Sequence, residues 1–202
     1  MKMKVVATIY TDFSEKFGIP RQGALAHESE GIIVFEPEYR MEEALRGTEK
    51  YSHLWLLWQF SENVSKKWSP TVRPPRLGGN KRVGVFATRS PFRPNPIGLT
   101  AVRLIGVEQT KNKGAVLRVA GVDLMNGTPI YDIKPYLPYA DSIPEASLGF
   151  AGEHLMDVLE VVCSDELWGK IPEEAEKRGQ KKAVRRARGP PHSSKTRDHL
   201  RL

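Results

Sequence analysis

The sequence predicts a mainly β fold: a small single-sheeted β-barrel with one or two peripheral helices and a basic C-terminal tail. Short apolar, β-branched runs recur along the chain with polar turns between them, which is typical of a closed barrel rather than of a βαβ layout. The 202 residues, 40% of them hydrophobic, are enough for one sizeable domain with an appendage. No G-x-G occurs in the sequence, so a Rossmann-type cofactor site has no fingerprint here.

Seven segments have the character of strands. Each is rich in β-branched, aromatic or other apolar side chains and is bounded by polar, glycine or proline residues. In chain order they are Val5–Thr11, Gly31–Glu36, His53–Phe60, Arg82–Thr88, Thr100–Val107, Ala115–Leu124 and Met156–Cys163. The glycine and lysines within 109–114 suit a hairpin turn between the fifth and sixth of these strands.

Two segments favour helix. Pro37 is suited to a first helical position, apolar residues then recur with helical spacing, and Gly47 is a stop signal. Ser164 is a plausible N-cap for a second helix over Asp165–Lys177, interrupted or restarted at Pro172.

Composition argues against several classes of protein. The single cysteine, Cys163, excludes an intramolecular disulfide framework, and without a Cys/His cluster no metal site is expected. The apolar run His53–Phe60 is far too short to cross a membrane. Strand-like sequence follows Met1-Lys-Met-Lys directly, without the apolar region of a signal peptide. We therefore expect a cytoplasmic protein.

The most informative segment is Phe86–Gly98, which places Arg89 and Arg93 among three prolines. Proline fixes φ and biases the preceding residue toward extended geometry, so this segment is stiff and is neither helix nor central strand. A stiff loop loses little entropy on closing over a ligand, and arginine suits carboxylate and phosphate groups. The segment therefore favours a ligand-binding role over a structural corner.

A second polar segment runs from Asp123 to Tyr136. Asn126-Gly127 is a turn signal, and an extended run follows Pro129. Strand alternation then places Asp132, Lys134 and Tyr136 on one face, as a polar site wall or, alternatively, as an internal salt bridge on an exposed strand. Two further loops combine proline, arginine and glycine, Phe17–Gly23 and Arg73–Arg82.

The net charge of +7 is unevenly distributed. Residues 1–169 carry 20 basic and 20 acidic residues, whereas residues 170–202 carry 11 basic and 4 acidic ones. The tail includes Lys181, Lys182, Arg185 and Arg186, which would attract a phosphate backbone without sequence preference; a solubilising tail is the alternative. We divide the chain into a barrel domain, 1–164, and a C-terminal helix with a flexible tail, 165–202.

Together these segments resemble a known family. The motifs FGIPRQ, SHLWLL, TVRPPRLGGN, GVFATRSPFRPNPIGLT and NGTPIYDIKPYLPYAD run in order from about Val5 to Asp141. They are similar to those of the TsaA-like, or TrmO, family of tRNA N6-methyltransferases. The resemblance implies S-adenosylmethionine as methyl donor, a non-Rossmann β-barrel, a homodimer and, as substrate, threonylcarbamoyl-adenosine at position 37 of a tRNA anticodon loop. Asn126 departs from the family's usual Asp-Gly-Thr-Pro.

The resemblance also implies residue roles. Arg89 is the first choice for a cofactor contact, and the other matched positions are Pro20, Arg21, Gln22, Phe60, Ser61, Leu99 and the turn Leu124, Met125, Asn126, Gly127 and Thr128. The backbone of that turn can meet the adenine edge. Contacts with the tRNA backbone are expected from Arg73, Arg76, Lys81, Arg82 and Arg93, with the four tail residues named above.

Catalysis calls for a proton acceptor, because the carbamoyl group makes the acceptor nitrogen a poor nucleophile. Asp132 is the better candidate and Tyr136 the other, whereas Lys134 can pair with the threonyl carboxylate of the substrate. His53 is a weaker candidate, since a lone histidine leading an apolar strand is more often structural. A tRNA-binding barrel without catalysis is the alternative function.

Overall fold

The computed structural model describes residues 3–23, 26–63 and 68–154, together with 164, 167 and 170. The chain divides into two compact units, Met1–Met156 and Asp157–Leu202. The first unit contains every strand of the described residues. In the second, the Ser164 hydroxyl oxygen accepts a hydrogen bond from the backbone N–H of Leu167 at 3.4 Å, which is the geometry of the predicted N-cap. The rest of the predicted helix, and the predicted strand Met156–Cys163, lie outside the described residues.

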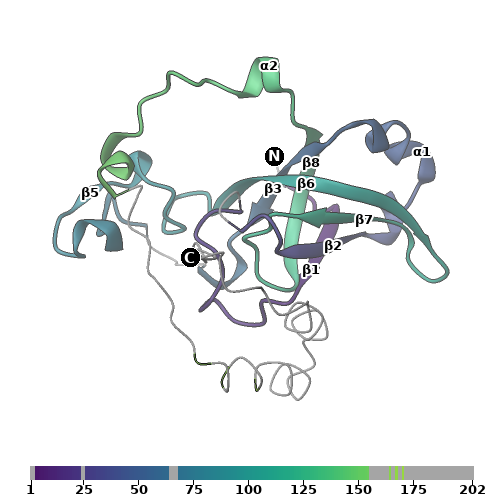
Figure 1. The fold of residues 1–202 in the computed structure, drawn as a ribbon, viewed down its shortest axis with the longest axis horizontal. Helices are drawn as coiled ribbons and strands as arrows, with labels where there is room; N and C mark the ends of the chain where they lie inside the picture. Colours follow the sequence, from purple (N-terminus) through teal and green to yellow (C-terminus); the bar gives the residue numbers. More distant parts are fainter. Residues whose placement is uncertain are drawn as a thin grey trace. The chain divides into compact units, whose positions relative to one another are not determined.

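Six antiparallel strands close into a barrel in the order β1-β2-β7-β6-β3-β8 (Figure 1). Their bounds are β1 Ala7–Thr11, β2 Glu30–Phe35, β3 His53–Gln59, β6 Ile97–Thr110, β7 Gly114–Ala120 and β8 Thr128–Pro135. A separate two-stranded sheet pairs β4, Thr71–Val72, with β5, Val83–Gly84. The predicted single-sheeted barrel is confirmed.

The described helices are short. Two are α-helical, α1 (Glu42–Leu45) and α2 (Pro138–Asp141). The 3-10 turns are η2 Pro37–Tyr39, η3 Thr48–Lys50, η4 Ser61–Asn63, η5 Pro75–Leu77, η6 Val85–Ala87 and η7 Gly149–His154.

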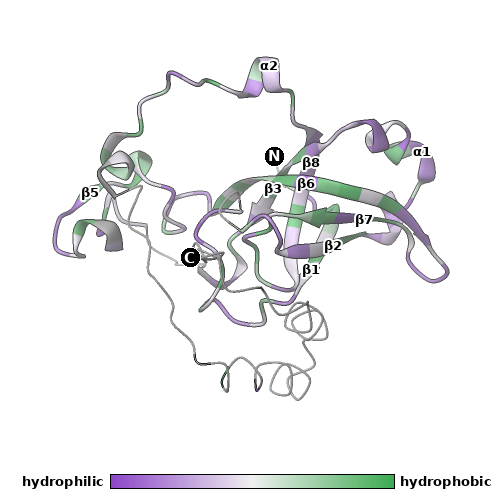
Figure 2. Cartoon of the chain, viewed as in Figure 1, coloured by the Kyte–Doolittle hydropathy of each residue, from purple (hydrophilic) through white to green (hydrophobic). Residues whose placement is uncertain are grey.

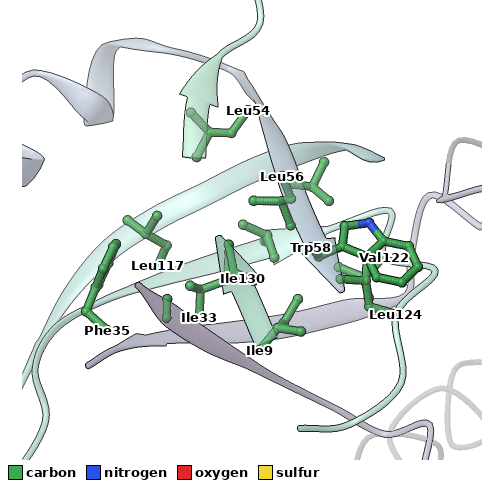
Figure 3. Close-up of a cluster of buried hydrophobic side chains, with 13 residues drawn as sticks. Ile9, Ile33, Phe35, Leu54, Leu56, Trp58, Leu117, Val122, Leu124 and Ile130 are labelled. Atoms are coloured by element: carbon green, nitrogen blue, oxygen red, sulfur yellow. The ribbon is translucent and has the colours of Figure 1, made fainter. Parts of the chain in front are cut away.

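The core fills the inside of the barrel. Alternate residues of the strands point inward, as the period of two requires. Ile9, Ile33, Leu56, Leu117 and Ile130 are fully buried (Figure 3). Burying each such side chain stabilises the fold by about 1.5–3 kcal/mol. In Figure 2, β6 changes from hydrophobic to hydrophilic residues toward its hairpin with β7, where the strand leaves the core.

Several predicted boundaries were wrong. The predicted helix over 37–47 breaks into η2 and α1 because the backbone at Met41 is extended (φ −85°, ψ 127°). The preceding residue, Arg40, donates a hydrogen bond from Nε to the carbonyl of Phe35 at 2.7 Å. The predicted strand over 82–88 pairs only at Val83–Gly84 and then turns into η6. β7 ends before Gly121, whose φ of 75° takes the chain out of the sheet.

Three connections meet at one end of the barrel. The register pairs the last residues of β1, β3 and β7 with the first residues of β2, β6 and β8. The segments 12–29, 60–96 and 121–127 therefore all leave and re-enter the barrel at the same end. The opposite end carries the tight hairpin over 111–113, as the sequence predicted. Long connections gathered at one end can build a binding site.

Candidate functional site

A cavity of about 580 Å³ lies at this end of the barrel, lined by the three connections and by the adjoining parts of β3 and β6. Its apolar wall is made by Ile19, Trp55, Trp58, Phe60, Ile97, Leu99 and Met125. Its charged wall is made by Lys16, Arg21, Glu62, Arg89, Arg93 and Asp123. An apolar pocket with a few converging polar groups is the usual form of a small-molecule site.

The structure brings nine of the twelve predicted cofactor residues together in this wall. They are Pro20, Arg21, Gln22, Phe60, Ser61, Arg89, Leu99, Met125 and Thr128. The other three do not line the cavity: Leu124 is fully buried in the core, and Asn126 and Gly127 lie exposed at the turn.

Arg89 joins two of the three connections. Its Nη1 donates a hydrogen bond to Gln22 Oε1 at 2.7 Å, across 67 positions of the sequence. Arg93 instead stabilises its own loop, because its Nη1 donates to the carbonyls of Thr88 at 3.0 Å and Ser90 at 3.3 Å. Arg93 was predicted to contact RNA, and the structure places it in the cavity wall. The two arginines of the proline-rich loop therefore have different neighbours.

Asp123 lies at the centre of a hydrogen-bond network that the sequence reasoning missed. Thr100 Oγ1 donates to Asp123 Oδ1 at 2.8 Å, and the backbone N–H of Gly23 donates to Asp123 Oδ2 at 3.0 Å. Thr100 Oγ1 also accepts a hydrogen bond from Trp58 Nε1 at 3.1 Å. Glycine is required at position 23, since a Cβ there would overlap the carbonyl oxygen of Gly121. The network therefore fixes the 12–29 connection against β3, β6 and the 121–127 connection.

Burial raises the pKa of the Asp123 carboxyl above its ordinary value, because an ionised carboxylate loses hydration there. The hydrogen bonds from Thr100 and Gly23 and the positive charge of Arg89 act in the opposite direction. Within the described part of the chain, Asp123 forms no ion pair.

The turn over 124–128 is held against β1. Asn126 Oδ1 accepts a hydrogen bond from the backbone N–H of Thr11 at 3.1 Å. An aspartate could accept the same bond, so Asn126 keeps the turn despite its departure from the family pattern. The backbone N–H groups of Asn126, Gly127 and Thr128 donate to the carbonyls of Phe13, Ile9 and Met125. The sequence predicts that the N–H and C=O groups of this turn can meet an adenine edge, and these three N–H groups already have hydrogen-bond partners within the protein.

Asp132, Lys134 and Tyr136 lie together on the outer face at the end of β8, and we call these three residues the β8 strip. Lys134 Nζ and Asp132 Oδ2 form an ion pair of 2.8 Å, with side chains 61% and 44% exposed. This is the salt bridge that the sequence left open as the alternative. None of the three residues lines the cavity. The Tyr136 ring, however, lies 5.3 Å from the ring of Trp55, and Trp55 lines the cavity. The strip is therefore separated from the cavity by one side chain.

His53, the weaker candidate for a proton acceptor, is exposed at the start of β3. Its Nδ1 is hydrogen-bonded to Ser52 Oγ at 3.0 Å, and its ring lies 6.2 Å from that of Tyr136. It does not line the cavity.

Four of the nine predicted RNA contacts lie in or beside the segment between β4 and β5. Arg73, Lys81 and Arg82 are exposed, and Arg82 Nε donates to Thr71 Oγ1 at 2.9 Å. Nothing is described for the side chain of Arg76, and the four basic tail residues lie outside the described residues. Residues 63–107 contain nine lysines and arginines and no acidic residue. This segment is therefore strongly basic, although the net charge of residues 1–169 is zero.

Two negative findings apply to the described residues. They contain no group of three or more His, Cys, Asp or Glu side chains arranged to hold a metal ion. None of the helices in the described ranges has the length and apolar character of a membrane span.

The fold and the site define the class of protein: a closed β-barrel with a cavity at one end, lined by basic groups and a partly buried carboxylate, which is the usual form of a small-molecule site. The model of the tRNA-methyltransferase O N-terminal domain family matches residues 8–142, and the chain belongs to this family.

Relatives and solved structures agree with this placement. The tRNA (adenine(37)-N6)-methyltransferase of Escherichia coli is 48% identical over 146 residues, which cover 72% of this chain and 62% of that protein. The human protein of the same name is 42% identical over 64% of this chain and 29% of its own length. The crystal structure of TrmO from Pseudomonas aeruginosa matches with a TM-score of 0.71 and 34% identity, covering 93% of this chain and 78% of that one. The chain thus spans less than two thirds of the length of these curated relatives.

Proposed function

We propose that this protein transfers a methyl group from S-adenosylmethionine to N6 of adenosine 37 in tRNA, and that the adenosine carries a threonylcarbamoyl group. Relatives named as tRNA (adenine(37)-N6)-methyltransferases support the reaction, and relatives named as S-adenosylmethionine-dependent methyltransferases support the donor. The observation that carries the proposal is the cavity, which gathers nine predicted cofactor residues, seven from the three connections and two from β6 and β8.

The cavity fits the chemistry of this donor. Arg89 and Arg21 offer guanidinium groups that suit the methionyl carboxylate. Phe60, Trp58 and Leu99 offer flat and apolar surface for an adenine ring. The bound donor supplies an electrophilic methyl group on a positively charged sulfur. The protein accelerates the transfer chiefly by holding donor and acceptor in line.

The acceptor base lies, in this proposal, over Trp55 and the β8 strip. Trp55 lines the cavity and is the cross-strand partner of Lys134, so it connects the two surfaces. Asp132 takes the proton that N6 loses as the methyl group arrives. Lys134 leaves its ion pair with Asp132 and binds the threonyl carboxylate of the substrate. Tyr136 packs beside Trp55.

The basic segment 63–107 supplies the contacts with tRNA phosphates. Nine positive charges without an acidic residue complement an RNA backbone. Trp68 and Phe86, 53% and 74% exposed, lie with ring centroids 6.4 Å apart beside the β4–β5 sheet and offer a stacking surface for unpaired anticodon-loop bases. The tail residues Lys181 to Arg186 add non-specific attraction. The family resemblance further favours a homodimer, and a cytoplasmic location stays a prediction from the sequence.

Mass spectrometry of tRNA nucleosides tests the reaction. Purified protein and S-adenosylmethionine are added to two preparations of the same tRNA, one carrying threonylcarbamoyl-adenosine and one with unmodified adenosine 37. We expect a mass increase of one methyl group on threonylcarbamoyl-adenosine only. Methylation of unmodified adenosine would show a different substrate, and binding of tRNA without any methylation would favour the non-catalytic module.

A further inference from the structure

Asp123 is a carboxylate held rigidly at the wall of the cavity. Each oxygen accepts one hydrogen bond, from Thr100 Oγ1 at 2.8 Å and from the Gly23 N–H at 3.0 Å. The indole of Trp58 fixes Thr100 in turn, at 3.1 Å. The position of the charge is therefore determined by the fold and not by a flexible side chain.

The charge of Asp123 is not neutralised by a partner within the described residues, where it forms no ion pair. Arg89 is near enough to act on it electrostatically, but within the described part of the chain the Arg89 guanidinium donates its hydrogen bond to Gln22. Burying a carboxylate without a counter-charge is unfavourable, so such a group is usually retained for a ligand or a reaction.

The other charged residues of the cavity wall match a different part of the donor. Lys16, Arg21, Arg89 and Arg93 attract a carboxylate and repel a positively charged sulfur. Among the described residues that line the cavity, the acidic side chains are Asp123 and Glu62, and Glu62 is exposed on η4. A fixed, partly buried carboxylate interacts more strongly than an exposed one, which water screens.

We propose that Asp123 faces the sulfonium of S-adenosylmethionine and makes the cavity selective for the positively charged donor over the product, S-adenosylhomocysteine, whose sulfur is neutral. The inference rests on the proposed function. It adds a physical reason for turnover: once the methyl group has left, the attraction to Asp123 disappears and the product is held less tightly.

Titration calorimetry of three ligands tests this selectivity without tRNA and without turnover. The ligands are S-adenosylmethionine, S-adenosylhomocysteine and sinefungin, which has a protonated amine where the donor has its methylated sulfur. In Asp123→Asn we expect the affinity for both cationic ligands to fall by about tenfold or more. The affinity for S-adenosylhomocysteine should change by less than about twofold. The matched control is Glu62→Gln, which removes the other carboxylate of the wall and should leave the selectivity unchanged.

Three results would overturn the proposal. Equal weakening of all three ligands in Asp123→Asn would mean that Asp123 maintains the shape of the cavity or faces another donor group. Unchanged binding would remove it from the site, and loss of selectivity in Glu62→Gln alone would assign the role to Glu62. If circular dichroism shows that Asp123→Asn is not folded, Asp123→Glu is measured instead. This variant keeps the carboxylate, so a folded Asp123→Glu that does not prefer the cationic ligands would also contradict a role of the charge. If the wild-type protein binds none of the ligands, the proposed function itself fails.

Discussion

The cavity and the β8 strip each contain an aspartate, and the two aspartates have opposite surroundings. Asp132 in the strip is 44% exposed and forms an ion pair of 2.8 Å with Lys134. Asp123 in the cavity has its pKa raised by burial, accepts hydrogen bonds from Thr100 and Gly23, and has no ion-pair partner within the described residues. Exposed charges of opposite sign contribute little to stability, and such a pair can exchange partners when a substrate arrives. A fixed carboxylate without a partner suits a permanent role in recognition.

The comparison implies that the two regions have different functions. Groups in the cavity should act on the methyl donor, and groups in the β8 strip should act on the acceptor nucleotide. Trp55 belongs to both surfaces, since it lines the cavity and contacts Tyr136. The variants below separate the two regions by what each changes.

Asp132→Asn should have the largest effect. If Asp132 accepts the N6 proton, its amide replacement loses turnover by ~10²–10⁴-fold. The rate is measured with saturating S-adenosylmethionine and tRNA that carries threonylcarbamoyl-adenosine. Turnover close to wild type would remove Asp132 as the base and leave positioning as the source of the rate.

Arg89→Ala should weaken donor binding. The variant loses a charged hydrogen-bond donor to the donor's carboxylate and releases Gln22, so we expect the dissociation constant to rise roughly 10- to 100-fold. Arg103→Ala is the control, because Arg103 is exposed on β6 and does not line the cavity. Equal affinities in the two variants would exclude Arg89 from the site.

Lys134→Met should act on the modified tRNA. Without the ammonium group the threonyl carboxylate loses its partner, so the apparent KM for this tRNA should rise by about tenfold while donor affinity stays constant. Binding of tRNA without the threonylcarbamoyl group should be unaffected. Weaker binding of both tRNAs would instead make Lys134 a phosphate contact.

The smallest expected effect is a change in stability with pH. The folded-state pKa of Asp123 lies above its ordinary value of 3.8, so the folded protein binds this proton more readily than the unfolded chain. The contribution of this group to stability is therefore full below pH 3.8 and is lost as the pH rises through the raised pKa. Relative to Asp123→Asn, wild-type protein should gain thermal stability on acidification across this window. A difference in Tm that does not vary with pH would contradict the burial of the charge.

The barrel could be predicted because its strands alternate in a pattern that each segment carries by itself. The failures occurred where tertiary contacts decide. Nothing local in Arg82–Thr88 indicates that only Val83–Gly84 finds a partner strand, and the extended backbone at Met41 that divides the predicted helix is equally hidden.

The same distinction holds for the site. Arg89 and the 20–22 motif could be selected from composition and family resemblance, and both line the cavity. Asp123 stood at the head of a polar segment that the sequence reasoning had selected, yet its partners Gly23 and Thr100 lie 100 and 23 positions away. Distances of this kind have no trace in a single sequence. The alternation of β8, in contrast, correctly grouped Asp132 with Lys134.

The division between donor and acceptor regions is tested most directly by measuring donor affinity in the two asparagine variants side by side. Calorimetry with S-adenosylmethionine should show a dissociation constant raised by about tenfold in Asp123→Asn and unchanged in Asp132→Asn. Both variants need only be folded for this comparison, and neither requires tRNA. Weakened donor binding in Asp132→Asn, with wild-type affinity in Asp123→Asn, would contradict the account.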